Sequence, residues 1–220
     1  MSTVARRPRV AFQGERGAFS EEAAVRLLGF DLELVPRPTF TDLFSSLDDC
    51  VADYLLAPVE NTLVGSIQPV AELFQASSMV VVAEVEIQIE QHLIGCPGSS
   101  FEVIEVVESH PVALAQCQRF FAVHPDLRQL EAEDTAGSVA RIVALGDPRR
   151  AAIAGRRAAK FYGGKILKEN LEDSPANLTR FLLLTRQEHL TKGSASGGSL
   201  DLAGSLKPDT SDSQQHQGNR

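Results

Sequence analysis

The chain has 220 residues, of which 43% are hydrophobic, and it carries a formal net charge of -8 with a pI near 5.2. This length is enough for one large domain or two small lobes with a sizeable core. The acidic balance excludes nucleic acid and anionic membrane surfaces as expected partners, because both need a basic face on the protein.

Short apolar segments alternate with amphipathic ones along the chain, which predicts strands alternating with helices. The predicted strands are 9–12, 32–35, 54–59, 79–93, 103–107, 127–130, 151–154, 166–167 and 181–185. Helices are predicted over 19–28, 67–75, 110–123 and 156–162, with Ser109 as the N-cap of the third. Two more begin at Thr39 or Thr41 and at Asp134 or Thr135, and they end near residues 50 and 145. This order predicts an α/β fold with mainly parallel strand pairing.

Segment 79–93 carries the longest strand signal. It begins as an unbroken apolar run and then alternates apolar with polar residues. The first part predicts a strand buried on both faces, and the second predicts a strand with one solvated face. We expect one continuous strand that crosses between two lobes near Ala83–Val85, with a return crossing near 171–177.

Polar clusters follow several predicted strands at the point where a helix begins: 14–20, 60–66, 109–110 and 134–135. Ligands of α/β folds bind beyond the carboxyl ends of strands, next to helix starts with free N–H groups. Glu60, Asn61 and Thr62 either cap the next helix or donate hydrogen bonds to substrate oxygens. His110 is a possible general base or a structural residue of a first helical turn.

Thr179, Arg180 and Phe181 stand where a loop enters the apolar run 182–184. A hydroxyl, a guanidinium and an aromatic ring would supply a proton donor, an anion clamp and an apolar wall for a small carboxylate ligand. The plainer interpretation is an ordinary strand start with a solvated Arg180. The histidines lack metal-ligand spacing, and the acidic residues form no magnesium or calcium motif, so no metal is expected.

Both ends of the chain are polar. The first eight residues lack the apolar segment of a signal peptide, and no apolar run is long enough to span a membrane. The three scattered cysteines suit a reducing compartment, so we expect a cytoplasmic protein. Residues 191–220 are rich in Gly, Ser, Asp and Gln and predict a disordered tail.

Six segments between Arg9 and Thr185 together resemble the prephenate dehydratase family, including its plant-type arogenate dehydratases. They are AFQGERGAFSEEAA, APVENTLVGSI, ESHPVALAQC, EDTAGSVA, AAIAGRRAAKFYG and NLTRFLLL. They follow the order of the family's motifs. Thr62 replaces a family Ser, and the regulatory ACT domain that many members carry has no counterpart in the polar tail.

The resemblance implies two α/β lobes similar to type II periplasmic binding proteins, with the active site in the cleft between them. The lobes are expected to comprise residues 8–84 plus 171–187, and 85–170. The implied catalytic residues are Thr179, Arg180 and Phe181. The implied substrate-binding residues are Ser20, Glu60, Asn61, Thr62, Thr135 and Asn177, and no cofactor is implied.

The implied activity is that of a lyase of L-phenylalanine biosynthesis, which removes water and CO₂ from prephenate to give phenylpyruvate. Thr179 would donate the proton, polarised by a neighbour, or would only orient a water. Arg180 would bind the side-chain carboxylate or hold its lobe together, and Phe181 would pack the ring. The alternatives are arogenate as substrate and a non-catalytic carboxylate-binding protein. A homodimer is the expected assembly.

Overall fold

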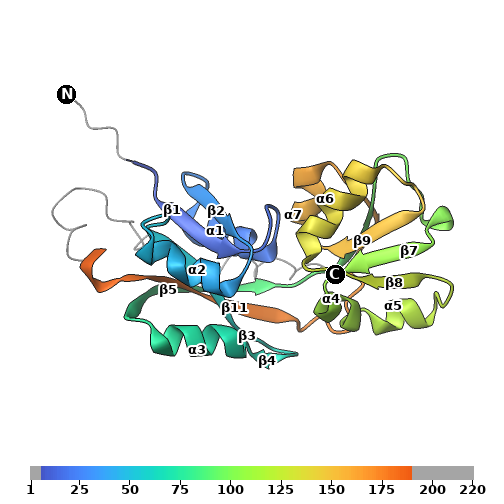
Figure 1. Cartoon of the computed structure of the whole chain (residues 1–220). Helices are drawn as coiled ribbons and strands as arrows, with labels where there is room; N and C mark the ends of the chain where they lie inside the picture. The colour runs from blue at the N-terminus through green and yellow to red at the C-terminus, as the bar shows by residue number, and fades with distance from the viewer. Residues whose placement is uncertain (1–5, 190–220) are drawn as a thin grey trace, which may run out of the picture.

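The computed structural model describes residues 6–189, which fold into two α/β lobes side by side (Figure 1). The predicted tail from Thr191 onward lies outside these residues. The first lobe holds a six-stranded sheet, in the order β2-β1-β3-β11-β5 with β4 beside β3. Its strands are β1 (Arg9–Gln13), β2 (Glu33–Arg37), β3 (Tyr54–Asn61), β4 (Gly65–Ser66), β5 (Met79–Gln88) and β11 (Leu178–Arg186).

The second lobe holds a five-stranded sheet in the order β10-β6-β9-β7-β8. Its strands are β6 (His92–Gly95), β7 (Val106–Ser109), β8 (Arg128–Glu131), β9 (Arg150–Ala154) and β10 (Lys165–Lys168). A short 3-10 turn, Phe101–Val103, precedes β7. In each sheet the three strands at one end pair in parallel, and the strands that lead to and from the lobe crossings pair antiparallel at the other end. The expected mainly parallel pairing is therefore wrong, because three of the five strand pairs in the first sheet and two of the four in the second are antiparallel.

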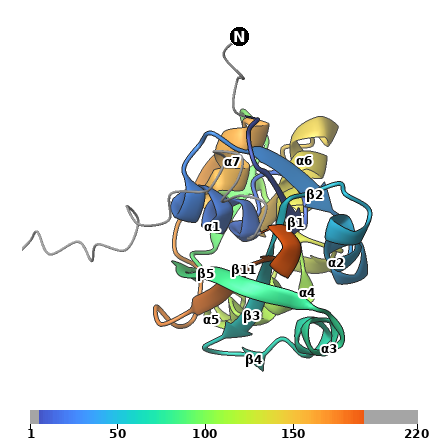
Figure 2. The ribbon, with the colours of Figure 1, turned by 90° about the vertical axis from the view of Figure 1, so that its left-hand side faces the viewer.

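Each sheet has apolar helices on both faces, which makes each lobe three layers thick. In the first lobe, α1 (Phe19–Leu28) packs on one face, and α2 (Phe40–Asp48) and α3 (Gln68–Ala76) pack on the other (Figure 2). In the second lobe, α4 (Pro111–Ala115) and α5 (Gln118–Ala122) cover one face. The opposite face carries α6 (Thr135–Leu145) and α7 (Arg156–Tyr162).

The crossing between the lobes lies later than expected. β5 stays hydrogen-bonded to β11 as far as Gln88, and β6 begins in the second sheet at His92. Residues 89–91 therefore form the first crossing, and 169–177 form the return. The two crossings run side by side, with Ile89 N donating to Asn177 O at 2.8 Å and Leu171 N donating to Gln91 O at 2.7 Å. Because β5 is the edge strand, its start is not buried on both faces, and Val81 is 47% exposed.

The predicted helix 110–123 is broken into α4 and α5 at Gln116 and Cys117. Its N-cap is His110, whose Nδ1 accepts from Val112 N, and not Ser109. The Ser109 side chain is buried and donates to Ile153 O at 2.6 Å. Ser109 is the last residue of β7, so its hydroxyl joins two neighbouring strands and is not free to cap the helix.

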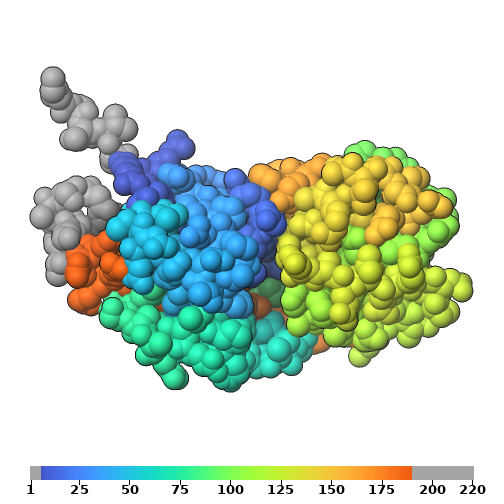
Figure 3. All heavy atoms as spheres, in the orientation of Figure 1, coloured from blue at the N-terminus to red at the C-terminus, as the bar shows by residue number. Residues whose placement is uncertain are grey.

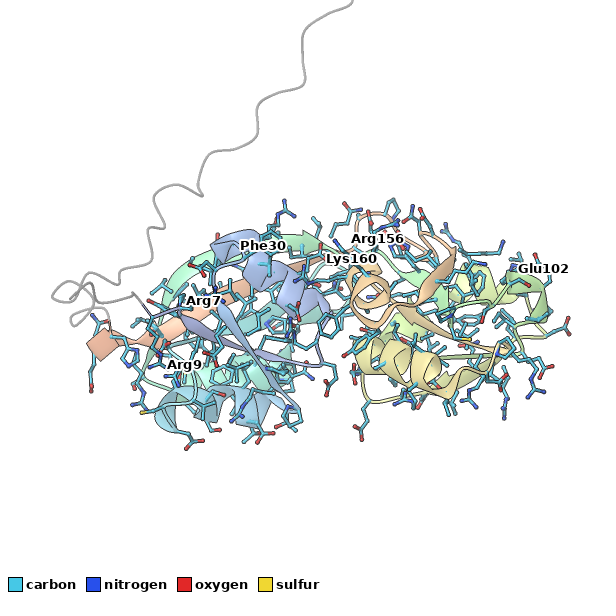
Figure 4. The ribbon with its side chains drawn as sticks, turned by 90° about the horizontal axis from the view of Figure 1, so that it is seen from above. Arg7, Arg9, Phe30, Glu102, Arg156 and Lys160 are labelled. Atoms are coloured by element: carbon cyan, nitrogen blue, oxygen red, sulfur yellow. The ribbon has the colours of Figure 1, made fainter. Side chains whose placement is uncertain are left out.

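The lobes also touch away from the crossings, where the loop before α1 meets the start of α7. Gly17 has φ +84°, and a Cβ there would lie 2.8 Å from the Ala158 Cα, so only glycine permits this approach. Glu21, on α1, is 1% exposed and accepts from Arg16 and, across the lobes, from Arg157 at 2.7 and 3.0 Å. Arg156 and Lys160 mark α7 beside α1 in Figure 4.

Candidate active site

A cleft of about 490 Å³ lies between the lobes and is lined by residues of both. In Figure 3 the two lobes meet along a narrow seam. The first-lobe wall comes from the ends of β1 and β3 and the starts of α1, α2, α3 and β11. The second-lobe wall comes from the starts of α4 and α6. Carboxyl ends of strands and starts of helices thus meet in one space, which is the usual place for a ligand in an α/β fold.

Thr179 and Phe181 face this cleft from β11, and both are nearly buried, at 7% and 2% exposed. Arg180 lies between them on the strand, and successive side chains of a strand point to opposite faces. Its guanidinium is therefore on the other face, 3.1 Å from Glu60 and 3.7 Å from Glu84. Arg180 and Glu60, both expected to contact substrate, do not line the cleft in this structure, because the strand pleat turns both away from it.

Asn61 holds the Thr179 hydroxyl in place. Its amide nitrogen donates to Thr179 Oγ1 at 2.9 Å, to Asn177 Oδ1 at 2.7 Å and to Leu178 O at 3.1 Å. Its amide oxygen accepts from Leu63 N and Val64 N, which fixes the orientation of the group. Because Thr179 Oγ1 accepts a hydrogen bond from Asn61, its own proton is directed to another acceptor, and the cleft is the space it faces.

The other expected site residues divide into two groups. Ser20, in the first turn of α1, and Thr135, the first residue of α6, line the cleft as expected. Thr62 does not, because its hydroxyl donates to Ala176 O at 2.5 Å and accepts from Leu178 N at 2.9 Å. Asn177 is fully buried behind Asn61 and is not part of the lining. In this structure Thr62 and Asn177 therefore join β3 to the return crossing and do not line the cleft.

The second-lobe wall includes residues that sequence reasoning left open or missed. His110 lines the cleft, as do Gln116, which directly follows α4, and the acidic residues Glu133 and Asp134. Asp134 caps α6 by accepting from Gly137 N at 2.5 Å. Gln91, from the first crossing, lies between the walls, and its amide donates to Gln116 Oε1 at 3.3 Å. His110, Gln116, Glu133 and Asp134 lie in two of the segments that resemble the family, whereas no sequence pattern points to Gln91.

Within residues 6–189, no group of three or more His, Cys, Asp or Glu side chains is placed to hold a metal ion. The same residues include no helix that combines the length and apolar character needed to cross a membrane. The arrangement offers instead a polarised hydroxyl, amide groups and helix starts around an apolar floor that includes Phe19, Ile89 and Phe181. Such a site can bind a small organic acid and protonate an oxygen on it.

Comparison with known proteins agrees with this geometry. The sequence model of the prephenate dehydratase family matches residues 10–189. The chain is 35% identical over 187 residues to a bifunctional chorismate mutase/prephenate dehydratase of Aquifex aeolicus, covering 84% of this chain and 51% of that protein. It is 37% identical over 180 residues to arogenate dehydratase 1 of Petunia hybrida, a match that covers 81% of this chain and 42% of that protein.

A solved prephenate dehydratase from Arthrobacter aurescens, in complex with L-Phe, superposes with a TM-score of 0.74 at 25% identity. The match covers 81% of this chain and 60% of that one. The chain thus spans about half the length of the curated relatives that it matches. Because the match extends over nearly all the described residues and includes both walls of the cleft, the chain belongs to the prephenate dehydratase family.

Proposed function

We propose that the chain is a prephenate dehydratase, which converts prephenate into phenylpyruvate, CO₂ and water. The observation that carries this proposal is the Thr179 hydroxyl, held by Asn61 at 2.9 Å with its proton free for a ligand in the cleft. The reaction must expel a ring hydroxyl, which is a poor leaving group until it is protonated.

In this mechanism the bond between the ring and its carboxylate breaks, and its electron pair enters the ring. The carbon–oxygen bond on the opposite side of the ring breaks at the same time, and the departing oxygen takes a proton from Thr179. Thr179 then regains a proton from water. The donation from Asn61 lowers the electron density on Oγ1 and so favours proton release. Phe181 and Phe19 supply the apolar floor on which the new aromatic ring lies.

Arogenate is a second candidate substrate, since it differs by an ammonium group in place of the side-chain keto oxygen. Glu133 favours it, because this residue belongs to the cleft lining and a carboxylate suits an ammonium partner. The assembly and location expected from the sequence remain part of the proposal: a homodimer in the cytoplasm, to be checked by light scattering and cell fractionation.

The deciding experiment supplies prephenate and arogenate separately to the purified chain and follows phenylpyruvate and phenylalanine by ultraviolet absorbance and chromatography. Turnover of prephenate above the spontaneous rate supports the proposal. Faster turnover of arogenate would identify it as the substrate. Binding of either compound without turnover would show a non-catalytic binding protein and overturn the dehydratase assignment.

A further inference from the structure

His110 occupies a defined place on the second-lobe wall. It directly follows β7 and precedes α4, and it lines the cleft. Its Nδ1 accepts a hydrogen bond from Val112 N at 3.2 Å. A neutral imidazole has one donor and one acceptor nitrogen, so the proton of the neutral ring must be on Nε2. In the neutral ring that makes this bond, His110 is therefore a donor through Nε2.

The charges of the cleft make this donor important. Among its lining residues, all within 6–189, Glu133 and Asp134 are acidic and none is Lys or Arg. Arg180 faces away, and Arg157 is held by Glu21. The proposed substrate carries two carboxylates, and His110 is a lining side chain that can donate an N–H from Nε2 to one of them while Nδ1 stays bonded to Val112 N.

The reaction itself indicates which carboxylate this is. The ring carboxylate leaves as CO₂, and a donor that stabilised it in the bound substrate would raise the barrier to its departure. The side-chain carboxylate is unchanged from substrate to product, so binding it carries no such cost. We propose that His110, through Nε2–H, binds the carboxylate that the substrate keeps; this inference rests on the proposed dehydratase function.

Two substitutions separate this role from helix capping. His110→Asn keeps an acceptor for Val112 N but removes the Nε2 donor, since Asn is an effective N-cap. In His110→Gln the side chain is longer than that of Asn. It carries an amide N–H near the position of Nε2 but loses the acceptor that caps α4. We expect His110→Asn to raise KM for prephenate by roughly tenfold, the cost of one charge-assisted hydrogen bond, with little change in kcat. His110→Gln should keep more of the binding and lose more thermal stability.

Calorimetry with phenylpyruvate as the probe tests which carboxylate is bound, without depending on turnover. Phenylpyruvate has lost the ring carboxylate, so His110→Asn should weaken its binding by a factor similar to the rise in KM. His124→Asn is the matched control, because His124 packs against Phe120 at 4.9 Å between ring centroids and does not line the cleft.

The outcomes are distinct. An unchanged phenylpyruvate Kd with a raised KM for prephenate would place His110 at the departing carboxylate and overturn the inference. Normal binding in His110→Asn with weakened binding in His110→Gln would show that His110 only caps α4. A wild-type chain that binds phenylpyruvate through His110 but does not turn over prephenate would overturn the dehydratase function and leave the carboxylate site standing.

Discussion

The two walls of the cleft are built from different kinds of hydrogen bond. On the first-lobe wall, Asn61 joins Asn177 and Thr179, which are 116 and 118 residues away in the sequence. On the second-lobe wall, His110 and Asp134 accept from backbone N–H groups two and three residues ahead. The first wall exists only when the whole lobe is folded, whereas the second forms with its helices. A substitution in the first wall should therefore lower kcat by disturbing the reacting group. Loss of a helix cap in the second wall should mainly lower the unfolding free energy.

Thr179→Ala gives the largest expected effect. It removes the proposed proton donor from the first wall and should lower kcat by ~10²–10⁴, the usual contribution of acid–base catalysis. Thr179→Ser keeps a hydroxyl for Asn61 to hold and should retain most of the activity. Steady-state kinetics with prephenate measure both variants, and thermal unfolding checks that both remain folded. Wild-type kcat in Thr179→Ala would remove Thr179 from the chemistry.

Asn61→Asp tests whether the orientation of the Thr179 hydroxyl matters. A carboxylate can still accept from Leu63 N and Val64 N, but it cannot donate to Thr179 and would accept the hydroxyl proton instead. We expect kcat to fall by about 10–100-fold, equivalent to a hydrogen bond of roughly 1.5–3 kcal/mol. Kinetics across a pH range measure this. A kcat equal to that of wild type would show that Asn61 serves only the fold of the first wall.

Glu21→Gln tests the contact that joins the two lobes outside the cleft. Burial raises the pKa of Glu21, but hydrogen bonds from Arg16, Gly17 N and Arg157 outweigh it, so its pKa lies below the ordinary value. A depressed folded-state pKa stabilises the protein above the unfolded pKa, and that stability is lost as pH falls through the folded-state pKa. We expect the substitution to lower the unfolding free energy by about 1–3 kcal/mol at pH 7. This is less than for a fully buried ion pair, because solvent screens the partly exposed arginines.

Denaturant unfolding at several pH values measures this loss, and the difference from wild type should narrow below about pH 4.3, the ordinary Glu pKa. Glu108→Gln is the matched control. Glu108 is also 1% exposed and binds two arginines, Arg141 and Arg150, but all three belong to the second lobe. Only Glu21→Gln should also change KM. Equal KM changes in both variants would show that the contact across the lobes has no part in forming the cleft.

The difference between the local hydrogen bonds of the second wall and the long-range ones of the first explains how much of the site the sequence could predict. The helix starts of the second wall follow from local patterns, and the residue pattern alone makes Asp134 a candidate cap. Family resemblance indicates Thr179, but the direction of Arg180 depends on the register of β11, which shifts against β3 between Arg180 and Phe181. The pairing of Glu21 with Arg157 joins residues 136 positions apart and explains the arginine at the start of α7, for which the sequence offers no reason.

Asp134→Ala removes the cap of α6 from the second wall. The lost side-chain acceptor should lower the unfolding free energy by about 1 kcal/mol, and Asp134→Ser should restore most of it. Because the cap is local, kcat should change far less than in Asn61→Asp. Thermal unfolding and kinetics on the same preparations measure both quantities. A fall in kcat as large as that of Asn61→Asp would show that the two walls do not differ in the way described.

Arg180→Gln should have the smallest effect, although Arg180 stands next to Thr179 in the chain. Its guanidinium is 42% exposed and bonds Glu60 and Glu84, themselves exposed, on the face of β11 away from the cleft. Exposed ion pairs contribute about 0–1 kcal/mol, so the unfolding free energy should change little, with less change still in high salt. Both kcat and KM for prephenate should stay near those of wild type, as steady-state kinetics would show. A KM raised by tenfold or more would mean that Arg180 reaches the substrate after all, through a change in the position of β11 when ligand binds, and the separation of the strand into a cleft face and an outer face would fail.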